Sequence, residues 1–235
     1  MARTKLEKLL TEEVNHYLGI PYAKNYWKNN LLIKEAILGG KGTWPEIDYA
    51  TTCAGEKYQV DITSLSPKEL YNFQKKHKIG IDCSGLVYHL LDFIDKNIGA
   101  NGILFKVVSV NPNHGKYGVR SLSADSLTNS INSYPITNYS HVQLGDLIRH
   151  HQGKHTLLIT GQKNNRLNYV HSSLTTLVSG VHTGYIKIID PQKPLFYQDW
   201  TDVTKNHQKY QELSDSKAGD GIYRLNCWKN ITFPL

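Results

Sequence analysis

The sequence lacks any long hydrophobic run. None of its apolar stretches approaches the roughly 18 residues that a membrane-spanning helix needs. Its first residues are charged and continue into an amphipathic pattern, so they offer no apolar core for an export signal. We therefore expect no membrane span, and a cytoplasmic location for the chain as encoded.

Cysteine is scarce as well. The chain of 235 residues has three cysteines, Cys53, Cys83 and Cys227. Three are too few for a disulfide framework, and the odd number leaves at least one thiol unpaired. A reducing compartment is expected, with a bridge between Cys53 and Cys227 as the alternative. A single domain with insertions, over residues 1–235, is the simplest organisation for this length.

The patterns that mark nucleic-acid and nucleotide binding are missing too. The chain has no arginine-rich run and no zinc-finger spacing, so we expect no nucleic-acid partner. Residues 39–43, Gly-Gly-Lys-Gly-Thr, lack the first glycine and the preceding strand of a phosphate-binding loop. The formal charge of +7 suits a polyanionic partner, although the lysines are scattered along the chain.

The first third of the chain is predicted to be mainly helical. Apolar residues at three- and four-residue spacing predict a helix over residues 6–18. The capping sequence Ser-Pro-Lys-Glu at residues 66–69 begins another helix, which we expect to end near residue 80. Between the two, the sequence predicts a short helix at residues 29–38 and a loop at 41–63.

The second half of the chain changes to short strands separated by Gly-, Asn- and Pro-rich turns. Helices first and strands afterwards indicate an α+β fold with an antiparallel sheet. In the middle we expect a strand at residues 103–110 and a helix that follows Ser123 and includes Ile131. The later strands are expected at residues 146–150, 155–160, 167–172, 184–189 and 221–228.

One cysteine is predicted to begin a helix. Asp82 is a good N-cap residue, which places Cys83 at about the first helical position. There the unpaired N–H groups and the positive end of the helix dipole favour a thiolate. A buried stripe at helical spacing follows, ended by Gly99. It consists of Leu86, Val87, Leu90, Leu91, Ile94 and Ile98.

Two histidines are predicted to face each other across a hairpin. A cysteine nucleophile needs an imidazole to accept its proton and a third polar group to orient that imidazole. His155 begins one strand and His171 ends the next, with a turn near residues 162–165. The start of one antiparallel strand lies opposite the end of its neighbour, so these histidines are expected to be close. Three others are predicted to be surface or loop residues: His114, His141 and His182.

Taken in order, these residues resemble the NlpC-type cell-wall cysteine peptidases. The resemblance rests on Asp82-Cys83-Ser84-Gly85-Leu86-Val87, Gly145-Asp146-Leu147-Ile148, His155, and Val170-His171-Ser172. Gly19-Ile20-Pro21-Tyr22 also matches the turn after the family's first helix. The similarity covers roughly residues 10–25 and 79–190, and residues 221–225 suggest a closing strand.

The resemblance implies a papain-like fold, in which N-terminal helices pack on an antiparallel sheet that carries the histidines. It implies Cys83 as nucleophile, His155 as base and then acid, and His171 as the orienting residue. The Cys83 backbone N–H would contribute to an oxyanion site, assisted by the Tyr22 hydroxyl. For Tyr22, packing beside Pro21 is an equal alternative. We expect no cofactor and no metal.

The expected activity is that of a cysteine peptidase acting through an acyl-enzyme on Cys83. Its substrate would be a peptidoglycan-derived peptide, cleaved at a peptide or amide bond of the stem. Residues 26–78 form an insertion longer than the family usually has there, and we expect it to act as a lid or groove wall. Delivery to the cell wall by another route, or removal of a signal, stays open.

Two other functions remain open at this point. One is a papain-like acyltransferase or amidase that acts on a lipid or a small amide. The other is a non-catalytic zinc or binding module, in which Cys83, His155 and His171 jointly hold the metal.

Overall fold

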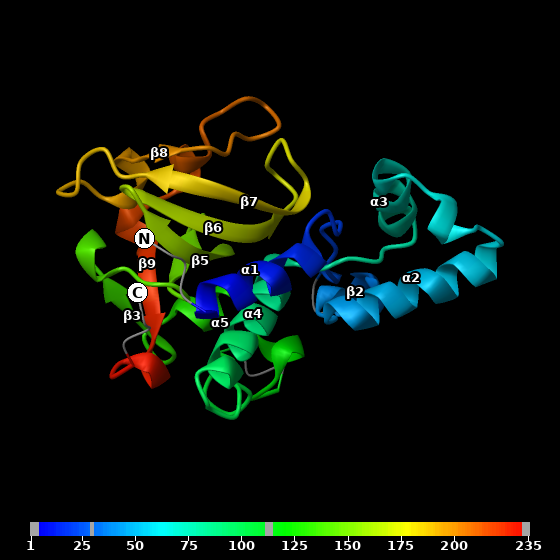
Figure 1. The fold of residues 1–235 in the computed structure, drawn as a ribbon, viewed down its shortest axis with the longest axis horizontal. Coiled ribbons are helices and arrows are strands. Elements are labelled where there is room, and N and C mark those ends of the chain that lie inside the picture. The colour runs from blue at the N-terminus through cyan, green and yellow to red at the C-terminus, as the bar shows by residue number, and fades with distance from the viewer. Residues whose placement is uncertain (1–4, 29–30, 111–114, 232–235) are drawn as a thin grey trace.

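The structure is a computed structural model that describes residues 5–28, 31–110 and 115–231. Within these ranges an antiparallel sheet of seven strands forms the body of the molecule (Figure 1). Helices and an antiparallel sheet together confirm the predicted α+β class. In sheet order, the strands are β3 (Ser133–Ile136), β9 (Gly221–Leu225), β4 (Leu147–His150), β5 (His155–Lys163), β6 (Arg166–Ser173), β7 (Gly180–Lys187) and β8 (Asp199–Trp200).

Three helices cover one face of this sheet. They are α1 (Lys5–Tyr17), α4 (Cys83–Asn97) and α5 (Ala124–Thr128). Alternate residues of the central strands point into this helical layer, among them Leu158 of β5 and Val170 of β6. The predicted first helix is confirmed, and so is the predicted leucine stripe of α4, except that Ile98 follows the last helical residue and is only partly buried.

The other face of the sheet packs against a second apolar cluster. Leu157 and Ile159 of β5 and Tyr169 of β6 point to this side, where Trp200 and Tyr210 cover them. Residues two apart along a strand point to the same face. His155 lies two residues before Leu157 and His171 two residues after Tyr169, so both histidines belong to this face. The histidines and the helical layer therefore lie on opposite sides of the sheet.

The region between the first helix and α4 differs from the prediction. It contains a hairpin of β1 (Tyr26–Lys28) and β2 (Leu31–Lys34) followed by α2 (Trp44–Tyr58) and α3 (Pro67–Lys76). The helix expected at residues 29–38 is therefore wrong in the described part of that range, and so is the loop expected at 41–63. Figure 1 shows α2 and α3 standing away from the sheet.

Local capping explains the missed helix α2. The Thr43 side chain accepts a hydrogen bond from the backbone N–H of Glu46, and the Glu46 carboxylate accepts from the Thr43 N–H. With Pro45 in the first turn, this is the capping box that also begins α3 at Ser66. The same sequence signal is present at both helices.

Smaller corrections concern the middle and the end of the chain. Residues 103–110 form turns and not a strand: Ile103 and Val107 are buried, but Phe105 between them is exposed. The helix after Ser123 ends at Thr128, and Ile131 is exposed. The strand expected at 184–189 begins earlier, and strands β3 and β8 were not predicted. None of the described helices is long and apolar enough to cross a membrane.

Candidate functional site

Cys83 is the first residue of α4, as the sequence predicts. The Asp82 carboxylate caps the helix by accepting a hydrogen bond from the Gly85 N–H at 2.7 Å. The Ser172 hydroxyl donates to the Ile81 carbonyl at 2.7 Å and ties the start of α4 to the end of β6. These two contacts fix the cysteine against the edge of the two central strands.

A glycine is required one turn into this helix. A Cβ on Gly85 would lie 2.9 Å from the Gly40 carbonyl oxygen, because the loop that follows the β1–β2 hairpin crosses there. The Asp82 N–H donates to the same carbonyl at 2.9 Å. The segment between the first helix and α4 therefore contacts the start of the cysteine helix.

The Cys83 thiol is buried, with 6 % of the residue exposed. Burial, together with the neighbouring Asp82 carboxylate, raises the pKa of this thiol to about 11. The Lys41 cation and the backbone N–H groups of Thr156 and Ser84 act in the opposite direction but do not prevail. The predicted thiolate is therefore wrong for the resting site, where burial and Asp82 outweigh Lys41 and the two backbone donors.

Lys41 is a charged neighbour of Cys83 that the sequence did not single out. Its ammonium donates hydrogen bonds to Asp82 at 2.8 Å, to the Ser84 hydroxyl, and to the Leu122 carbonyl at 3.1 Å. In the sequence, Lys41 is noticeable only as part of a possible phosphate-binding loop at residues 39–43. With that loop excluded, nothing else in the sequence points to this lysine. The pair of Lys41 and Asp82 places two opposite charges beside the sulfur.

His155 and His171 lie together, as the predicted hairpin requires. The strands β5 and β6 pair with Leu158 opposite Val170, and the hairpin turns at Asn164 and Asn165, both with positive φ. The distance from His155 Nε2 to His171 Nδ1 is 2.8 Å. The two imidazoles therefore share one hydrogen bond.

Asp202 extends this pair into a longer network. Its Oδ2 lies 2.9 Å from His171 Nε2 and accepts a hydrogen bond from the Tyr169 hydroxyl at 2.8 Å. Burial alone would raise the pKa of Asp202, but hydrogen bonds from His171 and His182 lower it below its usual range. The group is therefore a carboxylate, which only accepts hydrogen bonds.

The Asp202 carboxylate fixes the direction of the two hydrogen bonds that link it through His171 to His155. His171 donates from Nε2 to Asp202, so the Nδ1 of neutral His171 carries the lone pair and accepts from His155 Nε2. Burial lowers the pKa of His171 to about 4 and lowers that of His155 well below its usual range, so both rings are neutral at pH 7. The Nδ1 of His155 is then left with a lone pair and can take up a proton.

His182 joins the same cluster, contrary to its predicted surface position. It lies opposite His171 in the β6–β7 register and is 8 % exposed. Its Nδ1 donates to the Gly180 carbonyl at 3.0 Å, and its Nε2 lies 2.9 Å from His171 Nε2 and 3.4 Å from Asp202 Oδ2. Of the other two histidines, His141 is exposed as predicted and His114 lies outside the described residues.

The sulfur and the base come close at the start of β5. The Thr156 N–H, which donates to the Cys83 sulfur, belongs to the residue next to His155. Among the described residues no hydrogen bond joins that sulfur directly to a His155 ring nitrogen. Such contacts are often long in a substrate-free site and tighten when substrate binds.

Two tyrosines lie beside the sulfur. Burial raises the pKa of Tyr22 well above its usual range, and Cys83 and Asp82 add to the shift. Its hydroxyl therefore stays protonated and can donate. Tyr210 was not predicted; its ring centroid lies 5.7 Å from that of His171, and its pKa is also raised, first by burial and in part by Cys83.

A cleft of about 760 Å³ opens at the cysteine. Besides Cys83 and Tyr22, it is lined by residues from the first part of the region expected to be an insertion, including Glu35 and Leu38. Its charged lining is mainly positive. The charged residues are Lys24, Glu35, Lys41, Asp82, Arg120 and Lys154.

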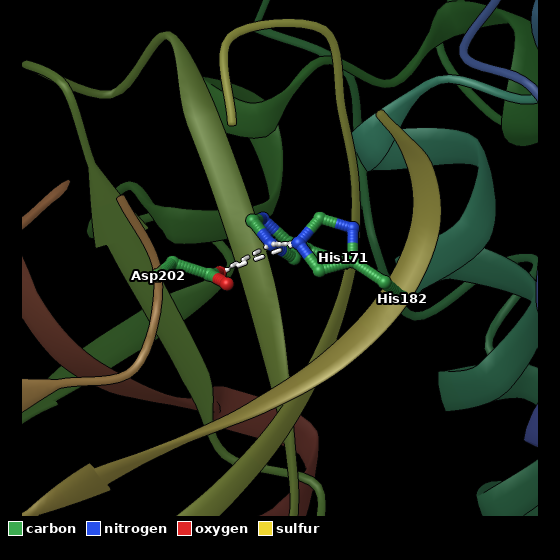
Figure 2. A group of neighbouring side chains, drawn as sticks. All are labelled: His171, His182 and Asp202. Carbon is green, nitrogen blue, oxygen red and sulfur yellow. Dashed lines mark hydrogen bonds and ion pairs between the residues drawn. The ribbon is translucent and has the colours of Figure 1, made fainter. Parts of the chain in front are cut away.

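One trio in the described part of the chain has the ligand types and spacing of a metal site. It consists of His171, His182 and Asp202, whose ligand atoms lie within 4.8 Å of one another (Figure 2). The alternative trio of Cys83, His155 and His171 forms no such group among the described residues. All three cysteines are free, so Cys53 and Cys227 do not pair.

Comparison of the chain with protein-family models, with curated proteins and with solved structures found no match.

Proposed function

We propose that the protein is a papain-like cysteine hydrolase of the NlpC type, with Cys83 as nucleophile and His155 as base. The observation that carries the proposal is the direction of the hydrogen bonds from Asp202 through His171 to His155. That direction leaves His155 Nδ1 as an acceptor at the start of β5, where the N–H of the next residue, Thr156, donates to the Cys83 sulfur. A thiol with a raised pKa needs such a base to become a nucleophile.

The reaction begins with both groups neutral. As the sulfur attacks the substrate carbonyl, its proton passes to His155 Nδ1, and the imidazolium is stabilised through His171 by the Asp202 carboxylate. His155 then protonates the leaving amine as the C–N bond breaks, which leaves a thioester on Cys83. Water resolves the thioester: His155 takes one proton from it and returns a proton to the sulfur.

The oxyanion of the tetrahedral intermediate needs donors near the sulfur. The Cys83 backbone N–H lies in the first turn of α4, where it has no partner within the helix. The protonated Tyr22 hydroxyl lines the same cleft and supplies a second donor. This supports the role for Tyr22 over simple packing beside Pro21.

The cleft supports an acidic peptide as substrate. Lys24, Arg120 and Lys154 line it in addition to the Lys41–Asp82 pair, against a single further carboxylate at Glu35. Stem peptides of peptidoglycan are short, branched and carry free carboxylates, which suits this charge. The β1–β2 hairpin region and the loop before α2 would then act as the groove wall, because Glu35 and Leu38 line the cleft.

The test is digestion of purified muropeptides followed by mass spectrometry of the fragments. We expect cleavage of a peptide or amide bond in the stem and its loss, by at least about 10³-fold, in Cys83→Ala. Cys53→Ser is the matched control, because Cys53 is exposed on α2 and away from the cleft. Equal activity in Cys83→Ala and the parent protein would overturn the proposal.

A further inference from the structure

We propose that His171, His182 and Asp202 form a binding site for one divalent transition-metal ion, zinc in the first place, and that the bound ion switches off the hydrolase. The binding site stands on its own geometry. The inhibition rests on the proposed function, because it acts on the hydrogen bonds that orient His155.

The three ligand atoms are spaced nearly as three ligands of one tetrahedral metal ion would be. His171 Nε2 lies 2.9 Å from His182 Nε2 and 2.9 Å from Asp202 Oδ2, and the last two atoms are 3.4 Å apart. Ligand atoms of a tetrahedral zinc ion are about 3.3 Å apart, given bonds of about 2.0–2.1 Å. From the three distances, an ion at that bond length lies about 1 Å out of their plane. Figure 2 shows the three side chains converging from β6, β7 and the segment after β8.

Each ligand is also oriented by a partner on its far side. His182 donates from Nδ1 to the Gly180 carbonyl at 3.0 Å, and Tyr169 donates to Asp202 at 2.8 Å. His171 is held at Nδ1 by His155 at 2.8 Å. Such outer contacts are typical of metal-binding histidines and carboxylates, because they fix the tautomer and the direction of the lone pair.

The ligand types favour a transition-metal ion such as zinc over a hard cation such as calcium. Two imidazoles and one carboxylate are a common set for zinc and related ions, whereas calcium and magnesium prefer oxygen ligands. The site is closed on the side of His171, which is fully buried, and His182 and Asp202 are slightly exposed. An ion therefore enters past His182 and Asp202, and a water molecule completes the coordination.

Metal binding reverses the direction of the hydrogen bonds toward the cysteine. Without metal, the proton of His171 is on Nε2 and points at Asp202. With metal, Nε2 gives its lone pair to the ion, so the proton of His171 moves to Nδ1 and points at His155. His155 must then accept at Nε2 and carry its own proton on Nδ1, the atom that has to receive the proton of Cys83. The ion therefore blocks the base without touching the sulfur.

Binding is tested first without any activity measurement. The Cys83→Ala protein is titrated with cobalt(II) and then with zinc, with visible absorption and calorimetry as readouts. We expect one equivalent of cobalt, the absorption bands of a four- or five-coordinate ion, no thiolate charge-transfer band, and displacement by zinc. His182→Phe should weaken zinc binding by more than the roughly 10–100-fold that losing an outer contact costs. His141→Ala, which removes an exposed histidine, should leave it unchanged.

Inhibition is tested second, with the muropeptide assay in the presence of a chelator or a small excess of zinc. Each variant is compared with itself: the ratio of activity with zinc to activity with chelator should fall to near zero in the parent and His141→Ala proteins and stay near one in His182→Phe. Absence of the one-equivalent cobalt complex, or its persistence in His182→Phe, would overturn the metal site whatever the activity. Binding without inhibition would overturn the switch. If metal binds as expected and the chelated protein cleaves nothing, the proposed function fails and the site stands.

Discussion

Cys83 is buried and Asp202 is partly buried, at opposite ends of one series of polar side chains, and burial affects the pKa values of the two groups differently. Around Cys83, burial and Asp82 together outweigh the donors, and the pKa of the thiol rises to about 11. Around Asp202, hydrogen bonds from two imidazoles outweigh burial, and the pKa of the carboxyl falls. The negative charge of this series is therefore on Asp202, at the end away from the sulfur. The Cys83 thiol stays protonated until substrate binds.

The largest expected effect concerns the neutral histidines on the Asp202 side. Burial lowers the pKa of His150 to about 3 and that of His171 to about 4, and also lowers that of His155. Their folded-state pKa values lie below the unfolded value of about 6.5, so their contribution to stability is complete above that pH and is lost as the pH falls. Each should cost about 1.4 kcal/mol per pH unit between about pH 6 and pH 4. Urea unfolding at several pH values measures the slope.

A matched variant isolates one of these histidines. The His150 side chain is fully buried, and its ring stacks on Tyr210 at 4.5 Å. His150→Phe keeps the stacking and removes the group that must stay neutral, so the acid slope should fall by about 1.4 kcal/mol per pH unit. His141→Ala should leave it unchanged. An unaltered slope in His150→Phe would show that His150 is not held neutral.

The next effect concerns the charge of Asp202 itself. Asp202→Asn keeps the shape but offers an amide that can donate to His171, which removes the fixed direction of the hydrogen bonds. Replacing the orienting carboxylate of a catalytic triad by its amide costs roughly 10⁴-fold, and here, one residue further away, we expect about 10³-fold in kcat with little change in KM. Asp199→Asn, at an exposed position on β8, is the control. Equal losses in kcat for both variants would contradict an orienting role.

The smallest effect concerns the cation beside the sulfur. Lys41→Met removes the charge that opposes the rise in the Cys83 pKa. Alkylation of Cys83 by iodoacetamide at pH 8 should slow by on the order of tenfold, the change expected for one pKa unit. Lys24→Met, on the lining of the same cleft, should change the rate far less. A faster rate in Lys41→Met would mean that the lysine restricts access to the sulfur more than it stabilises the thiolate.

The sequence predicts best what local patterns determine. The helix stripe of α4, the Asp82 cap and the β5–β6 hairpin depend on residues close together in the chain, and each appears as predicted. Helix α2 was missed although Thr43 and Glu46 form a capping box like that at Ser66. Its signal was local and available, but the residues that follow lack a clear apolar periodicity.

The missed part of the site depends on distant contacts. Asp202 lies in a segment without regular periodicity, and only the packing of β8 beside β7 brings it to His171. His182 was placed outside its strand because the strand begins at Gly180 and not at 184, so its pairing with His171 was lost. The raised pKa of Cys83 also depends on burial, which helix position alone does not reveal.

The central claim is most directly tested by intact-mass measurement of protein quenched in acid during turnover of a muropeptide. We predict an added mass equal to the acyl half of the substrate, located on the peptide that contains Cys83 and released by hydroxylamine. Product formation without an adduct on Cys83, or with an adduct on Cys53 or Cys227 instead, would contradict the account.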